Sequence, residues 1–528
     1  MNFNEQQREV INAIDGVWVV IAGPGAGKTA CMVERHLNMI SKGISQKDIL
    51  NLTFTNSAAS EAAKRVGLLN AEQVFRTFHS YALELIKKEC AHVPFKLTDT
   101  VIPVRGEDYQ LLFDLVKQFP AISSFRTLQG KISEWKRGNI EPGQAMSEAI
   151  GKEYYYAVAY EQYEKKCREQ GWLDFDSLIY ETINLLENEE VRGRWKKKYI
   201  AVDEFQDTDT RQLRMLGLLF SGNLMCVGDM NQGIYEWRGA HPDVVKHVYQ
   251  KFPDVQTLYL GINYRSTKKL VEFIRENLPI DNGLASRMST ENECGVDPIL
   301  IRYPNSETEV RQVLAEAIKD PENSVILART NRQLFDVQRA AASRGIKYRN
   351  LGKKDFFDQS EVKALLNLAK DANQFHKAKD ALQDIIHRNN LYNRYCSSGD
   401  PLYSDPIENL NNLVKMSENK GTVREFLDWS RRATYGRKSR KEQDLILSTV
   451  HQFKGLQAKH VFIIGCEQGR MPHRDGDIAE ERRIFFVAAS RAAETLQISW
   501  SGSRSEFLQN YSHETYEIDR VIESTNLN

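Results

Sequence analysis

The sequence predicts an α/β protein with two parallel sheets, each interrupted by a mainly helical insertion. The first observation is the apolar run Val17–Ile21, which enters a glycine-rich loop and then a helix. The second is the apolar run Tyr199–Val202, which two carboxylates follow directly. The third is a later series of short apolar runs, starting at Val296, that alternates with helical patterns. Strands that alternate with helices are typical of parallel sheets.

The composition is that of a globular protein of several domains. Its 528 residues are 41% hydrophobic and 27% charged. The 71 basic and 71 acidic side chains balance, so nucleic acid would have to be bound by a local groove. The seven cysteines form no Cys-x-x-Cys pair, which favours a reducing compartment and argues against iron–sulfur or structural zinc sites. No signal pattern or apolar run of ~20 residues is present, so we expect a cytoplasmic protein without membrane contact.

The first sheet domain is expected over residues 1–85 and 172–262. Residues 1–85 read as a helix, the first strand, the glycine-rich loop, a second helix and the strand Ile49–Phe54. Residues 86–171 contain few strand-like runs and include EYYYAVAYEQYEKKCREQ, so they are expected to form a helical insertion. The sheet then resumes with Tyr199–Val202 and a strand over Leu224–Val227.

The second sheet domain is expected over residues 263–360 and 442–528. Between its halves lies a polar, helical interval, residues 361–441, which ends in the basic run GRKSRK. That run could contact duplex phosphates, although a solvated linker is the more common role of such a run. The strands expected in this domain are Val296–Arg302, Ser324–Ala328, Leu445–Thr449 and Val461–Ile464.

The loop after Val17–Ile21 has the chemistry of a phosphate cradle. Its glycines permit the backbone conformations that turn successive N–H groups toward phosphate oxygens, and the helix that follows adds a favourable dipole. Lys28 would contact the β- and γ-phosphates, and Thr29 would ligate Mg²⁺. The residues of this cradle are Gly23, Pro24, Gly25, Ala26, Gly27, Lys28 and Thr29.

The segment DEFQDT supplies the second half of a nucleotide site. Asp203 would hold Mg²⁺, directly or through water, and Glu204 would accept a proton from an attacking water. Taken alone, an acidic pair after four apolar residues is more often an ordinary junction between a strand and a loop. The presence of Lys28 and Thr29 earlier in the chain favours ATP hydrolysis with Mg²⁺.

The glycine-rich loop and DEFQDT belong to a longer series of short motifs along the chain. Besides the loop, the series contains FNEQQREVI, LTFTNSAA (52–59), TFHS (77–80), LDFDSLI (173–179), DEFQDT, VGDMNQGIYEWRGA (227–240), NYRS (263–266), TVHQFKGLQ (449–457) and EERRIFFVAASRA (480–492). With this series the chain resembles the UvrD/Rep/PcrA family of superfamily 1 DNA helicases over nearly its whole length. The resemblance implies two RecA-like P-loop NTPase domains, ATP and Mg²⁺ as cofactors, and a helicase with 3′→5′ polarity.

The resemblance also assigns roles around the nucleotide. Gln7 would read the adenine edge and Tyr264 would stack on the base, while Gln232 would sense the γ-phosphate. Arg265 and Arg491 would act as arginine fingers from the second sheet domain. Outside the motifs, a surface ion pair would be the commoner role of such an arginine. Gln457 stands where the family usually has Glu, which puts the contact to the nucleotide sugar in question.

The DNA contacts that the resemblance implies are of two kinds. Aromatic rings stack on unpaired bases of any sequence, whereas an isolated aromatic residue is usually part of a core. The stacking residues would be Phe54, Phe175, Tyr235 and Trp237, with Arg238 beside them. The residues that bind backbone phosphates or position the loops would be Thr55, Asn56, Thr77, His79, Thr449 and His451.

The main functional hypothesis is an ATP-dependent single-stranded DNA translocase and 3′→5′ helicase that acts at single/double-strand junctions in repair, replication or defence. The interval 361–441 is shorter than the second insertion usual in the family. This departure motivates an alternative, a nucleotide-gated DNA-binding ATPase subunit that regulates a partner nuclease in a repair or anti-phage complex. A motor directed to RNA is a third possibility, which the DNA-helicase motifs disfavour.

Overall fold

The computed structural model describes residues 2–67, 74–93, 107–236, 239–240, 243–280, 282–351, 357, 359–391, 406–418, 420–435, 444–508 and 515–517. The chain forms two compact units. Unit 1 comprises residues Met1–Tyr264 and Ile280–Ser289, and unit 2 comprises Arg265–Pro279 and Thr290–Asn528. The chain therefore leaves unit 1 after Tyr264 and returns to it over Ile280–Ser289.

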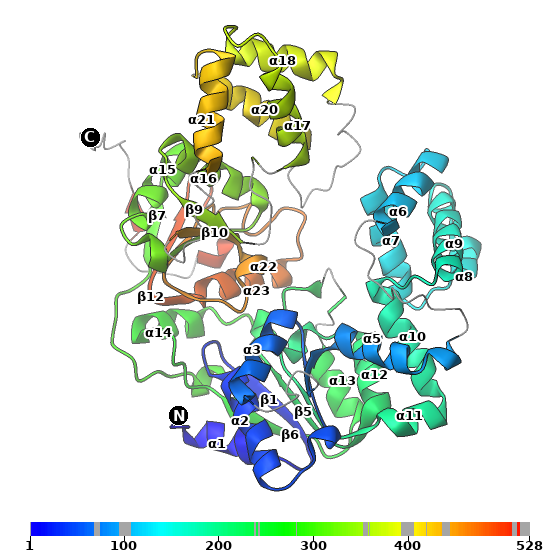
Figure 1. Cartoon of the computed structure of the whole chain (residues 1–528). Helices are drawn as coiled ribbons and strands as arrows, with labels where there is room; N and C mark the ends of the chain where they lie inside the picture. Colours follow the sequence, from blue (N-terminus) through cyan, green and yellow to red (C-terminus); the bar gives the residue numbers. More distant parts are fainter. Residues whose placement is uncertain are drawn as a thin grey trace. The chain divides into compact units, whose positions relative to one another are not determined.

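Unit 1 contains a six-stranded sheet in the order β3-β2-β4-β5-β1-β6, in which every pair is parallel (Figure 1). Its central strands are long apolar runs, so helices cover both faces. The strands are β1 (Val17–Ala22), β2 (Ile49–Thr53), β3 (Phe75–Thr77), β4 (Lys197–Val202), β5 (Phe220–Gly228) and β6 (Gln256–Leu260). The helices of this sheet are α1 (Glu5–Asn12), α2 (Lys28–Ser41), α3 (Asn56–Val66), α5 (Phe78–Lys88), α10 (Phe175–Glu187), α11 (Glu189–Trp195), α12 (Thr210–Leu219) and α13 (Val244–Lys251).

A helical group is inserted between α5 and α10 of unit 1. It consists of α6 (Glu107–Gln118), α7 (Phe125–Arg137), α8 (Pro142–Glu148) and α9 (Glu153–Gln170). These helices enclose a core of their own, in which Trp135 and Tyr160 stack with ring centroids 5.6 Å apart. Figure 1 shows them as a separate group beyond α5 and α10. The helical character expected for this part of the chain is confirmed for its described residues.

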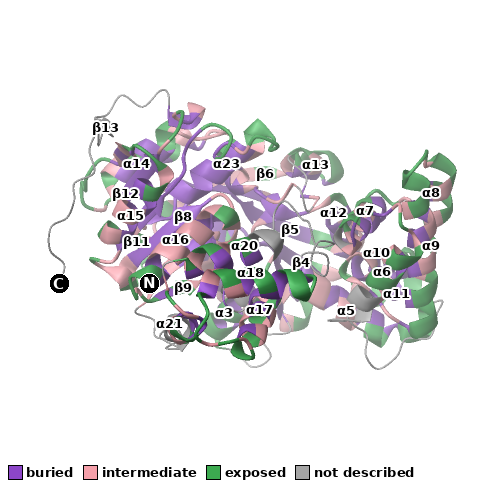
Figure 2. Ribbon diagram, turned by 90° about the horizontal axis from the view of Figure 1, so that it is seen from above, coloured by how far each residue is buried: buried purple, intermediate pink, exposed green. Residues whose placement is uncertain are grey.

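Unit 2 contains a seven-stranded parallel sheet in the order β13-β7-β12-β11-β8-β10-β9. Its strands are β7 (Ile299–Arg302), β8 (Ser324–Ala328), β9 (Tyr348–Asn350), β10 (Leu445–Thr449), β11 (Ala458–Ile463), β12 (Ala492–Trp500) and β13 (Thr515–Glu517). Helices α14 (Lys268–Glu276), α15 (Ser306–Ala317), α16 (Asn331–Ser343), α22 (Val450–Phe453) and α23 (Ile478–Ala489) accompany the sheet. Strand β8 is buried along its whole length, whereas β6 and β9 are mostly half-buried or exposed (Figure 2).

A second helical group belongs to unit 2. It contains α17 (Ser360–Lys370), α18 (Ala378–Arg388), α20 (Pro406–Ser417) and α21 (Val423–Tyr435). A small apolar core that includes Leu365, Leu382 and Phe426 lies between these helices. The basic run Arg437–Lys441 lies outside the described residues.

The expected α/β class with two parallel sheets is confirmed. The strand expected over Val296–Arg302 begins later, at Ile299, because Pro298 cannot donate to a neighbouring strand.

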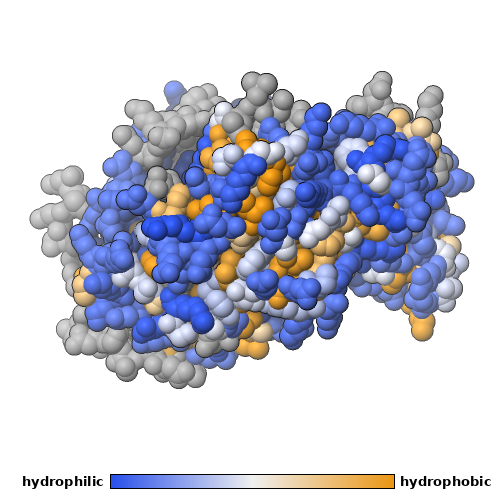
Figure 3. Space-filling model, turned by 90° about the horizontal axis from the view of Figure 1, so that it is seen from below, coloured by the Kyte–Doolittle hydropathy of each residue, from blue (hydrophilic) through white to orange (hydrophobic). Residues whose placement is uncertain are grey.

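Polar residues cover most of the face seen in Figure 3, with apolar residues between them. Within the part of the chain that the structure describes, no helix has both the length and the apolar character needed to cross a membrane.

Candidate nucleotide and DNA site

The loop between β1 and α2 is shaped to bind an anion. Gly25 and Gly27 adopt φ values of +69° and +80°, which a residue with a side chain rarely adopts. The loop is anchored to β6 because the Gly23 N–H donates to the Leu260 carbonyl oxygen at 2.8 Å. Helix α2 begins at Lys28, and no side chain caps its N-terminus. The first backbone N–H groups of a helix have no partner further along the helix, and at such an N-terminus they can donate to phosphate oxygens.

Two carboxylates from the end of β4 lie beside this loop. Asp203 Oδ2 is 3.5 Å from Thr29 Oγ1, and Glu204 Oε1 is 3.6 Å from Lys28 Nζ. Strands β4 and β1 are separated only by β5, so their carboxyl ends meet at one edge of the sheet, where ligands of α/β proteins bind. Glu204 has φ +51° and ψ +44°, an uncommon conformation for a residue with a side chain. This conformation turns Glu204 toward the loop instead of continuing the strand direction.

Burial disfavours the ionised forms of two carboxyl groups at this edge. Burial raises the pKa of Asp203, the nearby Glu204 charge raises it further, and Lys28 lowers it. Burial also raises the pKa of Asp229, which follows β5. A divalent cation would stabilise both ionised forms, and carboxylate and hydroxyl oxygens suit Mg²⁺.

Thr29 and Asp203 fit a Mg²⁺ site in which the protein supplies only a few of the ligands. Among the described residues, no cluster of three or more acidic, histidine or cysteine side chains could enclose a metal. Mg²⁺ commonly takes one or two protein oxygens and completes its shell with water and substrate phosphates. Thr29 and Asp203 supply that number.

Two residues of this site were not predicted from the sequence, Gln206 and Asp229. Gln206 Nε2 donates to Glu204 Oε2 at 2.5 Å, while its Oε1 accepts from the Asp229 N–H at 3.0 Å. Asp229 Oδ2 in turn accepts from Gln232 Nε2 at 2.7 Å. A Cβ on Gly228 would lie 2.5 Å from Gln206 Oε1, so a side chain at this position would displace the Gln206 amide. A continuous chain of hydrogen bonds therefore connects Glu204 with Gln232, the predicted γ-phosphate sensor.

The residues expected at the adenine base also come together in unit 1. Gln7 is buried in a capping box with Asn4 at the start of α1, and its Nε2 donates to the Ala26 carbonyl oxygen at 3.2 Å. Tyr264 is 48% exposed, its hydroxyl accepts from Asn4 Nδ2 at 2.6 Å, and its N–H donates to the Gly25 carbonyl oxygen at 3.0 Å. The Tyr264 ring therefore has an exposed surface beside the phosphate loop.

In unit 2 the structure brings Arg265, Gln457 and Arg491 together. Arg265 Nε donates to Gln457 Oε1 at 2.7 Å, and its Nη1 donates to the Ser490 carbonyl oxygen at 2.7 Å. Arg491 is only 2% exposed, and its Nε donates to the Val487 carbonyl oxygen at 3.0 Å. Each unit is described by itself, so the roles of both arginines at a nucleotide held by unit 1 stay predictions.

The stacking residues Phe54, Tyr235 and Phe175 lie in two exposed or half-buried aromatic pairs, one of which includes His79. Phe54 and Tyr235 stack with centroids 5.2 Å apart, and His79 meets Phe175 edge to face at 5.5 Å. Phe175 is 56% exposed, so it is not a core residue. Burial lowers the pKa of His79, so a neutral imidazole is expected at pH 7 and any phosphate contact would be a hydrogen bond, not an ion pair.

The smaller residues expected at the DNA backbone are mostly engaged in local structure. Thr55 and Thr77 cap α3 and α5 through their side-chain oxygens, and Thr77 Oγ1 donates to Asn56 Oδ1 at 3.4 Å. Thr449 ends β10 and is buried, and His451 lies on α22. Trp237 and Arg238 lie outside the described residues. The capping threonines favour the loop-positioning role over direct phosphate contact.

Comparison with known protein families gives two matches that together span most of the chain. The UvrD/REP helicase N-terminal domain matches residues 3–253. The UvrD-like helicase C-terminal domain matches residues 258–392 and 373–503.

Individual helicases are similar over nearly the whole chain. The ATP-dependent DNA helicase Rep of Escherichia coli is 26% identical, with 96% of this chain and 92% of Rep covered. The ATP-dependent DNA helicase PcrA of Staphylococcus aureus is 27% identical, with 96% of this chain and 84% of PcrA covered. The alignments run over 628 and 620 positions, more than the 528 residues of this chain, so these relatives contain residues that it lacks.

Proposed function

Because the chain belongs to the UvrD/Rep/PcrA family of superfamily 1 helicases, we propose that it is an ATP- and Mg²⁺-dependent motor on single-stranded DNA. Its two parallel sheets are the RecA-like domains of that family. The motor moves 3′→5′ along the strand and separates duplex at single/double-strand junctions. The observation that carries this proposal is the meeting of Lys28 and Thr29 with Glu204 and Asp203 at one edge of a parallel sheet.

Each residue at this edge of the sheet has a separate role in ATP hydrolysis. Lys28 and the backbone N–H groups of the loop bind the phosphates, and Thr29 with Asp203 holds Mg²⁺. Mg²⁺, when bound, neutralises phosphate charge. Glu204 accepts the proton of the attacking water, and its bond to Gln206 orients the carboxylate for that task. Gln232 reports the presence of the γ-phosphate through its bond to Asp229.

Arg265 and Arg491 of unit 2 complete the site as arginine fingers, since charge develops on the transferring phosphoryl group. The boundary between the units falls between Tyr264 and Arg265. One peptide bond thus joins the adenine-stacking ring to a finger arginine. Hydrolysis then requires both units, which makes it responsive to their movement.

The strand is held mainly by rings and not by base-specific hydrogen bonds. Phe54, Tyr235 and Phe175 present aromatic surface that stacks on any base, at ~1–3 kcal/mol per base. Movement of the units between nucleotide states then passes bases along these rings. Sequence-independent contact suits a motor that must travel along any strand.

We further propose that the chain consists of four parts, two sheet domains and two helical insertions, with the second insertion shortened. The C-terminal family match falls into two pieces that overlap over residues 373–392, inside this second helical group, which supports the shortening. A short second insertion also favours a second candidate function, a DNA-binding ATPase subunit that regulates a partner nuclease. In that role the isolated chain hydrolyses ATP but unwinds little.

Strand displacement separates the two functions. The substrates are duplexes with either a 3′ or a 5′ single-stranded tail, and Mg²⁺-ATP starts the reaction. For the helicase we expect displacement of the 3′-tailed duplex alone, and none with Glu204→Gln. DNA-stimulated hydrolysis without displacement of either substrate supports the regulatory subunit, and displacement of only the 5′-tailed duplex contradicts the proposed polarity.

A further inference from the structure

Phe175 is the first residue of helix α10, and two carboxylates flank it in the sequence. Asp174 caps the helix by accepting from the Ser177 N–H at 2.7 Å, and Asp176 lies in the first turn. The first turn of a helix frays easily because its backbone N–H groups lack partners within the helix. The place of the exposed Phe175 ring therefore depends on what holds Asp174 and Asp176.

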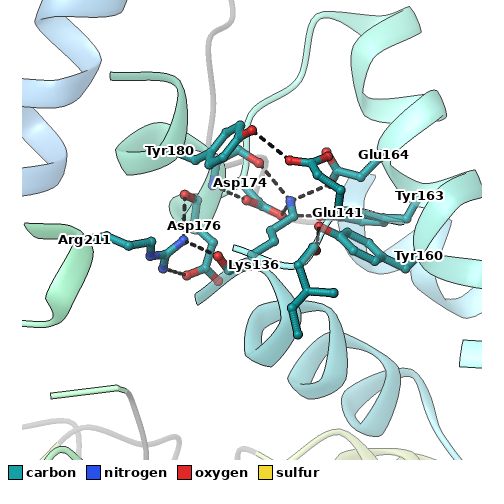
Figure 4. A network of polar contacts seen from close by, with 11 residues as sticks. Lys136, Glu141, Tyr160, Tyr163, Glu164, Asp174, Asp176, Tyr180 and Arg211 are labelled. Atoms are coloured by element: carbon teal, nitrogen blue, oxygen red, sulfur yellow. Dashed lines mark hydrogen bonds and ion pairs between the residues drawn. The ribbon is translucent and has the colours of Figure 1, made fainter. Parts of the chain in front are cut away.

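Lys136, at the end of α7 in the helical group, holds Asp174 (Figure 4). Its Nζ lies 2.6 Å from Asp174 Oδ2, 2.5 Å from Glu164 Oε1 and 2.8 Å from Ser177 Oγ. The Tyr163 hydroxyl donates to the same Asp174 oxygen at 3.1 Å. Burial by itself would lower the pKa of Lys136, but Asp174 and Glu164 raise it above its ordinary value. Lys136 is thus a buried, charged group with satisfied partners.

Arg211, on α12, holds Asp176 from the other side (Figure 4). Its Nη2 donates to Asp176 Oδ1 at 2.6 Å, and its Nη1 donates to the Lys136 carbonyl oxygen at 3.2 Å. One guanidinium therefore joins the first turn of α10 to the last turn of α7. Helix α12 follows DEFQDT closely, since its cap is Asp209. The catalytic segment, the helical group and Phe175 are thereby connected through buried ion pairs.

We propose that Lys136 and Arg211 are positioning residues that hold the first turn of α10, so that the Phe175 ring lies where an unpaired base stacks on it. This inference rests on the proposed function. Lys136 is 7% exposed and Arg211 is 3% exposed, so neither reaches a DNA phosphate. They also neutralise two acids that would otherwise repel the phosphates beside the ring. Both cations act on DNA through Phe175.

A double-mutant cycle tests this dependence. Fluorescence anisotropy measures the Kd of the full chain for a labelled oligothymidylate without nucleotide, so hydrolysis is not needed. We expect Phe175→Ala to raise Kd about 5- to 100-fold, the range for one lost stacked base. Arg211→Ala should raise Kd about 3- to 10-fold in the wild-type background and less than about 2-fold in the Phe175→Ala background. Arg214→Ala is the matched control, because Arg214 lies on the same helix as Arg211 and forms a half-exposed ion pair with Glu187 of α10. It should leave Kd unchanged.

The salt dependence of Kd distinguishes a positioning role of Arg211 from direct contact with a DNA phosphate. Removing an arginine that binds a phosphate lowers the slope of log Kd against log salt by about one. For Arg211→Ala we expect a parallel line, displaced to weaker binding. If thermal unfolding shows that this variant does not fold, Asp176→Asn breaks the same pair and takes its place in the cycle.

The outcomes separate the two proposals. A wild-type chain that does not bind the oligonucleotide overturns the proposed function. If Phe175→Ala weakens binding but Arg211→Ala leaves Kd unchanged, the positioning role alone is overturned. The same conclusion follows if Arg211→Ala raises Kd equally in the wild-type and Phe175→Ala backgrounds. Non-additive effects with parallel salt slopes support it.

Discussion

Replacing Glu204 by Gln is expected to lower single-stranded DNA-stimulated ATP hydrolysis by about 10²- to 10⁴-fold, the usual contribution of a general base. The substitution removes the proton acceptor but keeps the size of the side chain and an oxygen that can accept from Gln206 Nε2. Nucleotide binding should persist, because the phosphate loop and Lys28 are unchanged. Steady-state hydrolysis with saturating oligonucleotide measures the rate, and a fluorescent ATP analogue measures binding.

Glu189→Gln is the control for this substitution, because Glu189 is a highly exposed carboxylate of the same unit. Its rate should equal that of the wild type. Equal rates for Glu204→Gln and the wild type would show that Glu204 is not the base. Loss of nucleotide binding together with activity would show instead that the substitution had disturbed the loop.

Replacing Arg265 by Ala should lower the DNA-stimulated rate by about 10³-fold, at the lower end of the range for an arginine finger. The guanidinium is held by Gln457 and the Ser490 carbonyl oxygen, so it is already oriented before nucleotide binds. Arg265→Lys keeps the charge but loses the planar fork, and we expect it to recover little activity. The Kd for single-stranded DNA without nucleotide should not change, because Arg265 is not proposed to touch DNA.

Arg275→Ala provides the comparison for Arg265, since Arg275 is an exposed arginine on α14 of the same unit. It should hydrolyse ATP at the wild-type rate. A rate for Arg265→Ala within a few-fold of this control would remove Arg265 from the proposed mechanism, and Arg491 would remain the only finger candidate.

The two strands predicted with their observed bounds, β8 and β10, are buried along nearly their whole length. β8 and β10 have the expected bounds because SVILA and LILST are apolar runs between polar segments. β3 and β9 were missed because each has only three residues, too few for a periodic signal. β12 was missed because AAETLQISW places a glutamate, a threonine and a glutamine within a strand whose later residues are buried. Its burial comes from the sheet around it, which local propensity cannot reveal.

The sequence predicts those residues of the candidate site that belong to a recognisable motif. It does not predict features that depend on backbone conformation or on contacts between distant parts of the chain. Lys28, Thr29, Asp203 and Glu204 were found by their motifs, and the structure places them together. The left-handed conformation of Glu204 is not visible in the sequence, because that region is occupied more often by Gly and Asn. Gln206 stands in the DEFQDT motif, but its partner Asp229 follows another strand, β5, so the sequence does not show the contact between them.

The contacts around Phe175 are a further case of this kind. Lys136 and Arg211 carry no motif of their own in the sequence analysis. They become significant because folding brings α7 and α12 to the first turn of α10. In the sequence the members of these ion pairs are charged residues far apart along the chain. Most charged residues lie on the surface, so nothing in the sequence marks these as buried partners.

The central claim, ATP-driven 3′→5′ movement along single-stranded DNA, is tested most directly by displacement of streptavidin from biotinylated oligonucleotides. This measurement needs no duplex, so it also holds for a translocase that unwinds poorly. With Mg²⁺-ATP we expect faster release of streptavidin from a 5′-biotin, where a 3′→5′ motor arrives, and no acceleration from a 3′-biotin. Release from both ends at the rate seen without ATP would contradict the claim.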